Sequence, residues 1–364
     1  MFNIFLLLNL DYPDYINSDL SVYDKNLVIE KMTAKAILEN YNFVALNSSS
    51  KLLSKPNPKQ SLTFVTPWNS VGYDLLLNFG GKFSYVVPTW LTYDCSSSTP
   101  HYIGLDVVNE TWLKLMKEQH PNTKILVRLA VLSDFSAPLL DGRFVKDTIN
   151  VLKEVSKSNL IDGFYLENQQ LFQNEAFIKQ IHSHLRQFKK AFPGKCTIGI
   201  DIPIFYRIDY NNQNVQKLLK TMIKDFDFFY IAAYEIPTTL SPLSVMDKII
   251  SSINNIDSKL KEKLIIGLPF FGFKINQIQR SKNYIFGDEI IQILHTNPAY
   301  VTWLHDSHEH IIAYRNDKIR TTIQIEYPSL KFFDDRIVYV KTLPILGLGF
   351  WEIAQGLPYF FDTL

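Results

Sequence analysis

Asp162-Gly-Phe-Tyr-Leu-Glu-Asn-Gln169 contains a short apolar run after Asp162 and ends in polar side chains. A run of this length, bounded by breakers, is typical of a strand buried in a parallel sheet. Seven further runs alternate with amphipathic stretches: Leu62–Thr66, Tyr85–Leu91, Lys124–Leu129, Thr197–Ile202, Phe228–Tyr234, Leu264–Phe270 and Gly347–Trp351. Eight strands that alternate with helices predict an α/β fold, a closed (β/α)8 TIM barrel.

The connecting segments support a barrel over an open doubly wound sheet, because no Gly-x-Gly-x-x-Gly motif follows an early strand. Predicted helices are Thr111–Glu118, Asn174–Ala191, Val215–Ile223, Val245–Ile253 and Leu330–Val340. Between the seventh and eighth strands, His310–Tyr314 and Thr321–Ile325 flank a polar turn. This pattern predicts a β-hairpin added to the barrel.

The chain has 364 residues, the size of one barrel with an N-terminal extension. We expect a signal peptide or a disordered start at 1–22, an N-terminal arm at 23–60 that ends in breaker residues, and the barrel at 61–364. Lys and Arg total 37 against 36 Asp and Glu. This balance gives no reason to expect nucleic acid or an anionic membrane as a partner.

The apolar stretch Met1–Leu10 has the length of a signal-peptide core and is too short to span a membrane. It is either a secretory signal or a disordered start, and the expected location is secreted or lysosomal. Asn47 and Asn109 begin glycosylation sequons that only the secretory route would use. Cys95 and Cys196 are too few for a disulfide scaffold, and their pairing stays open.

Chemistry in such a barrel gathers where the strands end. Because strand side chains alternate, Tyr165, Glu167 and Gln169 are expected to share the inward face. Glu167 is either a site residue or a buried carboxylate paired with Arg128. The other candidates at strand ends are Tyr234, Glu235, Trp351, Trp90 and Trp68. Trp90 and Trp68 are each either an aromatic residue at the barrel rim or a residue packed in the core.

These strand ends resemble glycoside hydrolase family 18, the chitinases and chitinase-like lectins. The resemblance rests on Asp162-Gly163, Tyr234-Glu235, Gly267-Leu-Pro-Phe-Phe-Gly272 and Trp351. Phe64-Val-Thr-Pro-Trp-Asn-Ser-Val-Gly-Tyr73 and Phe350-Trp-Glu-Ile-Ala-Gln-Gly356 are similar to one branch, the stabilin-interacting chitinase-like proteins. The resemblance to this branch runs from about Asp24 to the C-terminus. It implies that Trp351 floors a sugar subsite and that Tyr234 and Glu235 contact an N-acetyl sugar.

Active members of that family carry Asp-Gly-x-Asp-x-Asp-x-Glu on the fourth strand. In this chain the four acidic positions are Asp162, Tyr165, Glu167 and Gln169, so the terminal acid is an amide. Glu167 lies about 6 to 7 Å deeper along the strand, outside hydrogen-bond reach of the position where the acid would act. The loss of a general acid alone lowers the rate by about 10²- to 10⁴-fold.

The resemblance therefore implies a non-catalytic protein that binds chitin-type or N-acetylglucosamine-containing oligosaccharides, with no catalytic residue. Two alternatives remain: a weak hydrolase that uses Glu167 or Glu235, and a protein-interaction module in secretory or lysosomal traffic with a sorting receptor. The stretch His305-Asp-Ser-His-Glu-His310 is expected to be a solvated hairpin edge rather than a metal site, because nothing specifies further ligands. No cofactor and no metal are expected.

Overall fold

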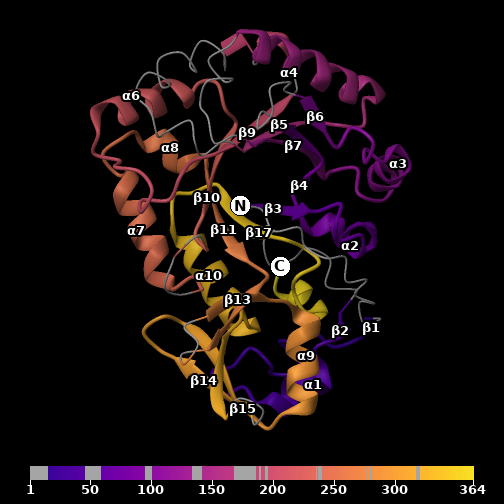
Figure 1. Ribbon diagram of the computed structural model, residues 1–364, viewed down its shortest axis with the longest axis vertical. Helices are drawn as coiled ribbons and strands as arrows, with labels where there is room; N and C mark the ends of the chain where they lie inside the picture. The colour runs from indigo at the N-terminus through magenta and orange to yellow at the C-terminus, as the bar shows by residue number, and fades with distance from the viewer. Residues whose placement is uncertain are drawn as a thin grey trace.

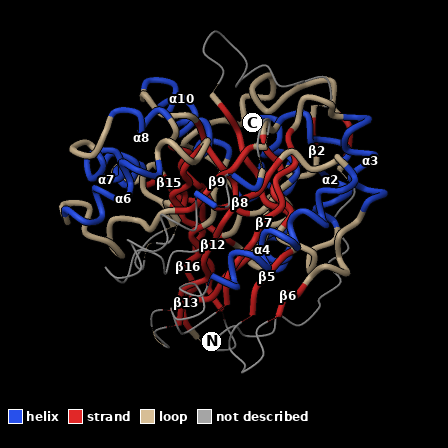
Figure 2. Tube along the Cα trace, turned by 90° about the horizontal axis from the view of Figure 1, so that it is seen from above, coloured by secondary structure: helices blue, strands red, loops and turns tan. Residues whose placement is uncertain are grey.

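The structure of the protein is a computed structural model. It describes residues 15–45, 59–94, 101–132, 142–167, 186–187, 190–192, 196–234, 236, 240–276, 278, 281–316 and 320–364. Within these residues a central set of strands is surrounded by helices, which Figure 2 shows from above.

The barrel is closed and has eight parallel strands, as the sequence predicts. They are β3 (Gln60–Val65), β4 (Tyr85–Pro88), β7 (Lys124–Leu132), β8 (Gly163–Glu167), β9 (Thr197–Asp201), β10 (Phe228–Ala232), β11 (Leu264–Pro269) and β17 (Gly347–Trp351). Each strand pairs with its neighbour in this order, β17 pairs with β3, and β4 pairs with β7 through Tyr85–Lys124 and Val86–Ile125. No edge of the barrel sheet is left open among these strands.

One predicted strand, Tyr85–Leu91, is divided in two. β4 ends at Pro88, which has no N–H to continue a ladder. The next strand is β5 (Leu91–Asp94), which pairs with the C-terminal half of β7 and with β6 (His101–Ile103).

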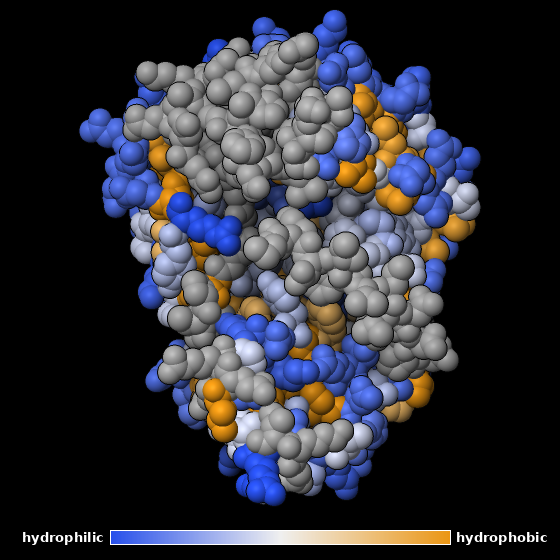
Figure 3. Space-filling model, viewed as in Figure 1, coloured by the Kyte–Doolittle hydropathy of each residue, from blue (hydrophilic) through white to orange (hydrophobic). Residues whose placement is uncertain are grey.

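Helices cover the outside of the barrel (Figure 1). They are α2 (Val71–Phe79), α3 (Glu110–Gln119), α4 (Gly142–Val155), α6 (Gln213–Met222), α7 (Leu243–Ile253), α8 (Ser258–Glu262) and α10 (Leu330–Thr342), with short 3-10 helices η1 (Gly80–Lys82), η3 (Ser156–Ser158) and η5 (Pro358–Thr363). Most of the predicted helix Asn174–Ala191 lies outside the described residues. None of the described helices is both long and apolar enough to cross a membrane. The face in Figure 3 mixes hydrophilic side chains with small apolar patches.

The addition between the seventh and eighth barrel strands is larger than the predicted hairpin. The hairpin is present as β15 (Glu309–Asn316) and β16 (Thr321–Glu326), which pair antiparallel. It belongs to a five-stranded sheet with β12 (Gly272–Asn276), β13 (Ser281–Ile285) and β14 (Ala299–Leu304), and α9 (Gly287–Thr296) precedes β14. We call this sheet and α9 the insert.

Residues 15–45 pack against the barrel and the insert. They contain β1 (Ile16–Asn17), α1 (Ala34–Asn40) and β2 (Phe43–Val44), and α1 contacts α9 and β14 (Figure 1). The carboxylate of Asp362 in η5 accepts hydrogen bonds from the N–H groups of Val22 at 3.0 Å and Ala45 at 2.8 Å. The first described residues are thereby joined to the last ones.

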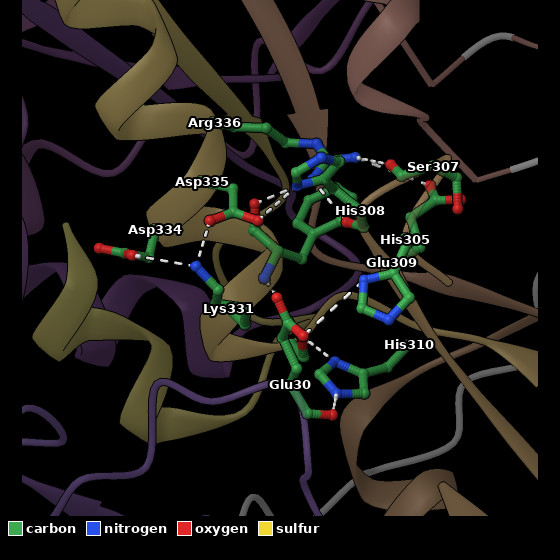
Figure 4. A network of polar contacts seen from close by, with 12 residues as sticks. Glu30, His305, Ser307, His308, Glu309, His310, Lys331, Asp334, Asp335 and Arg336 are labelled. Atoms are coloured by element: carbon green, nitrogen blue, oxygen red, sulfur yellow. Dashed lines mark hydrogen bonds and ion pairs between the residues drawn. The ribbon is translucent and has the colours of Figure 1, made fainter. Parts of the chain in front are cut away.

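A network of polar contacts locks the insert to α10 (Figure 4). The Arg336 side chain is fully buried and donates to the carbonyls of Ser241, Ser307 and His308. Burial lowers the pKa of Arg336 to about 9, although the carboxylate of Glu309 opposes this shift. The guanidinium satisfies carbonyls that would otherwise be buried without a donor.

The expectation of a solvated edge at His305–His310 is wrong for Glu309 and His310, which are 5% and 3% exposed. The ring of His310 contacts the hydroxyl of Ser329 at 2.7 Å and the carbonyl of Glu30 at 2.9 Å. Both ring nitrogens thus have protein partners, and burial lowers the pKa of His310. His308 is hydrogen-bonded to Asp335 at 2.7 Å. These histidines join the insert to α10 and to the first described residues.

Replacement of Arg336 by Met is expected to lower the free energy of unfolding by about 3 to 5 kcal/mol, because it leaves several buried carbonyls without their donor and the buried Glu309 carboxylate without its cation. Lys248→Met on the exposed face of α7 is the matched control and should change it by less than about 0.5 kcal/mol. Chemical denaturation of both variants measures the difference. Equal effects would show that Arg336 contributes no more than a surface cation.

Candidate functional site

The interior of the barrel is filled by aromatic side chains up to its mouth. The ring of Phe64 on β3 lies 5.2 Å from that of Tyr165, 5.3 Å from Tyr230 and 5.0 Å from Trp351. Tyr165 is 1% exposed, and Trp351 is only partly buried. The register predicted for Tyr165 is therefore confirmed, but its ring belongs to the packed interior beneath the mouth. Trp351 is the member of this cluster that keeps accessible surface.

Glu167 ends β8 and forms a bidentate ion pair with Arg128 on β7. Arg128 Nη2 donates to Glu167 Oε1 at 2.8 Å, and Arg128 Nε donates to Glu167 Oε2. The Arg128 side chain is 12% exposed and that of Glu167 is 33% exposed. Of the two sequence alternatives for Glu167, the pairing with Arg128 is the one observed. Burial lowers the pKa of Arg128, but Glu167, together with Tyr165 and Asp201, more than offsets this effect, so the pKa is raised.

Asp201, at the end of β9, was not identified as a candidate by the sequence analysis. It is 3% exposed, and together with Glu167 it acts electrostatically on Tyr165. Burial, with these two carboxylates, raises the pKa of Tyr165 far above its usual value, so Tyr165 stays a neutral phenol. The signal was available, because Asp201 is a polar residue at the carboxyl end of a predicted strand.

Asp162, the first acidic position of the strand-four motif, lies at the opposite end of β8. Its Oδ2 accepts hydrogen bonds from the N–H of Ile125 at 2.7 Å and from Lys117 Nζ at 2.5 Å. These contacts join β8 to β7 and α3. Asp162 therefore supports the barrel at its base and is remote from the strand ends.

Two other aromatic candidates differ in position. Trp90 is 2% exposed, its indole N–H donates to the Tyr73 hydroxyl at 2.6 Å, and its ring lies 6.1 Å from that of Trp112. Trp90 is therefore packed in the core, the second of its two alternatives, and offers no ring face to a ligand. Trp68 follows β3 and is 53% exposed, as a rim aromatic would be.

Tyr234 lies just beyond β10 and is partly buried. Its hydroxyl is 3.2 Å from that of Tyr230, and its ring meets Phe271 edge to face at 5.6 Å. Glu235 and Gln169 lie outside the described residues, as does Cys95. Tyr165, Glu167, Tyr234 and Trp351 thus come from β8, the end of β10 and β17, toward the carboxyl ends of the barrel strands.

Glu352 follows Trp351 directly and is fully buried. Its Oε1 accepts a hydrogen bond from Asn69 Nδ2 at 2.9 Å, and burial raises the pKa of Glu352 to about 8 despite that bond. At neutral pH the carboxyl group is therefore mostly protonated. Since no surface of Glu352 is accessible, it cannot touch a substrate in this conformation. Among the described residues, no group of three or more His, Cys, Asp or Glu side chains could hold a metal ion.

The fold is shared with chitinases and chitinase-like proteins. No protein-family model matches the chain. The spore cortex-lytic enzyme SleL of Bacillus cereus superposes with a TM-score of 0.69 at 12% identity, over 84% of this chain and 73% of that one. For the class V chitinase of Nicotiana tobaccum the TM-score is 0.64 at 10% identity, over 84% and 98%. YKL-39, solved with chitooligosaccharides, gives 0.59 at 15% identity, over 84% and 98%.

The proton on Glu352 makes a testable contribution to stability. The pKa of Glu352 is raised from 4.5 to about 8 in the folded state, so the folded chain binds more protons than the unfolded chain between these values. Stability from this group is fully present below pH 4.5 and falls toward pH 8 by at most about 1.4 kcal/mol per pH unit.

Glu352→Gln keeps an acceptor for Asn69 and removes the titration. We expect its free energy of unfolding to fall less steeply with pH than that of the wild type over this window. Chemical denaturation of both proteins at a series of pH values measures the two slopes. Parallel curves would show that Glu352 does not retain its proton in the folded state.

Proposed function

We propose that this protein is a non-catalytic chitinase-like protein that binds N-acetylglucosamine-containing oligosaccharides at the barrel mouth. The observation that carries the proposal is the bidentate pair between Arg128 and Glu167. A general acid must reach the leaving oxygen with a transferable proton, whereas both carboxylate oxygens of Glu167 are engaged as acceptors by the Arg128 guanidinium. The remaining carboxylate of the strand-four motif at the mouth is thus engaged as an ion-pair partner.

Position 169 supports the same conclusion from the sequence. The family resemblance places the proton donor there, and the residue is Gln. An amide can donate a hydrogen bond, but it does not deliver a proton to a leaving oxygen. Neither Gln169 nor Glu167 therefore supplies acid catalysis.

Aromatic side chains at the mouth support sugar binding. Trp351 and Tyr234 keep accessible ring surface, and Trp68 is more than half exposed. Rings of this kind combine a large apolar face with polar groups at their edges, which suits the apolar C–H faces and hydroxyl groups of a sugar. The structure of YKL-39 with chitooligosaccharides supports this choice of ligand class, as does the sequence resemblance to the stabilin-interacting branch.

A secreted or lysosomal location is part of the proposal. The Met1–Leu10 stretch supports it. The alternative function, weak hydrolysis through Glu235, is favoured by the enzymes among the structural neighbours. The two functions differ in whether a bound oligosaccharide is cleaved.

Trp351→Ala is expected to weaken the binding of chitotetraose by about 2 kcal/mol, roughly thirtyfold, because it removes the partly exposed ring at the mouth. Isothermal titration calorimetry measures the loss. Trp303→Ala in the insert is the matched control, since it truncates a partly buried Trp beside His310 and should leave the affinity unchanged. An unchanged affinity for the Trp351 variant would place the sugar elsewhere.

The unaltered protein is expected to show no hydrolysis of chitooligosaccharides under acidic, neutral or alkaline conditions. Gln169→Glu should add little, because the Asp that precedes the acid in active members is here Glu167, tied to Arg128. Product analysis by mass spectrometry measures cleavage. Robust hydrolysis that survives Gln169→Ala but is lost in Glu235→Gln would establish the alternative function.

A further inference from the structure

A row of lysines lies on the outer face of α6, away from the barrel interior. Lys217, Lys220 and Lys224 are all exposed, whereas Val215 and Leu219 are buried. At 100° per residue Lys217 and Lys220 lie about 60° apart around the helix axis, so they share one face, and Lys224 lies in the turn that follows α6. Hydrophilic side chains stand out at the upper left of Figure 3, where Figure 1 places α6. An exposed lysine face is by itself the ordinary outer side of an amphipathic helix.

The lysine row borders a hollow in the surface. The hollow has a volume of about 500 Å³ and is lined by Arg186, Gln213, Gln216, Lys217, Lys220, Thr221 and Lys224. Arg186 belongs to a separate segment of the chain, so cations from two places in the sequence meet around one cavity. None of these lining residues carries a carboxylate.

The charge of this hollow is not compensated within the described part of the chain. Lys35 and Lys157, on other helices, each form an ion pair with a neighbouring Glu. Lys217, Lys220 and Lys224 form none within the described residues. Neighbouring like charges on a helix are destabilising. The helix dipole favours Lys220 and Lys224 near the C-terminal end, but it does not account for Lys217 or for the approach of Arg186.

We propose that this hollow, here called the α6 groove, binds a linear sulfated polysaccharide. Its cations come from α6 (Lys217 and Lys220), from the turn after α6 (Lys224) and from a separate segment (Arg186), an arrangement that fits a ligand with several anionic groups in a row better than a single sulfate or phosphate. Gln213, Gln216 and Thr221 also line the groove. Gln216 Nε2 and the Thr221 hydroxyl donate to backbone carbonyls, so the oxygens of these two side chains remain as acceptors for sugar hydroxyls.

The same lining argues against two other polyanions. Single-stranded nucleic acid is held by aromatic rings on which its bases stack, and no ring is among the described residues that line the groove. An anionic membrane is held by a basic face beside apolar side chains that enter the lipid, and the described lining has no such side chain. The α6 groove also lies outside the barrel, so the inference does not rest on sugar binding at Trp351.

The test uses a size-defined heparin oligosaccharide as the probe, with titration calorimetry at several salt concentrations. The variant Lys217→Gln/Lys220→Gln/Lys224→Gln removes the three charges and keeps flexible polar side chains. It should bind at least about tenfold more weakly, and the slope of log K against log salt should fall by about 2 to 3, since three cations no longer displace counterions. Arg186→Gln should weaken binding in the same direction.

The matched control is Lys114→Gln/Lys153→Gln/Lys248→Gln, which makes the same charge change at three exposed lysines on α3, α4 and α7. It should bind heparin like the wild type. An equal loss in both triple variants, or no salt-dependent binding by the wild type, overturns the proposal. Tighter binding of an RNA homopolymer or of phosphatidylserine vesicles than of heparin overturns the choice of ligand. Chitotetraose binding should be unchanged in the groove variant, which separates this site from the barrel mouth.

Discussion

Aromatic packing inside the barrel is the constraint on which the other features depend. Phe228 and Tyr230 of β10 project into the barrel, and the neighbouring strands make room for them with glycines. A Cβ at Gly199 would lie 2.0 Å from the Phe228 ring, and one at Gly267 would lie 2.1 Å from the Tyr230 hydroxyl. Large side chains on β10 thus require residues without a side chain, Gly199 and Gly267, on the strands beside it. This packing fills the interior up to Phe64, so that only the uppermost layer can meet a ligand.

The same packing distinguishes the end of β8 from the motif that the family resemblance predicts there. Tyr165 takes a position where the family resemblance predicts a carboxylate, and its ring completes the aromatic interior. The carboxylates that remain above it, Glu167 and Asp201, lie close to Arg128, whose charge is nearly buried. A buried guanidinium needs a partner of opposite charge, and Glu167 provides it through two hydrogen bonds.

The outer surface carries a different kind of chemistry from the interior. Around the barrel mouth the accessible groups among the described residues include aromatic rings and the Glu167 carboxylate, whereas the described lining of the α6 groove consists of cations, amides and a hydroxyl. Trp351 is partly buried against Phe64, but the lysines of α6 stand on an exposed face. A neutral sugar and a polyanionic one would therefore be recognised by separate surfaces of one scaffold, as is common when a single fold serves several functions.

The sequence by itself determined the eight strands, their order, and the inward face of Tyr165 and Glu167, because strand length and the two-residue alternation are local properties. It also determined the amide at position 169. It left open the roles of Glu167 and Trp90, since each depends on what lies across from it. Only the tertiary structure brought Arg128 to Glu167, packed Trp90 against Tyr73, and enclosed Glu352 so that it keeps its proton. Only it joined Arg186 to α6 and tied residues 15–45 to the insert through His310. Burial and charge pairing are set by segments far apart in the chain, and no local pattern contains that information.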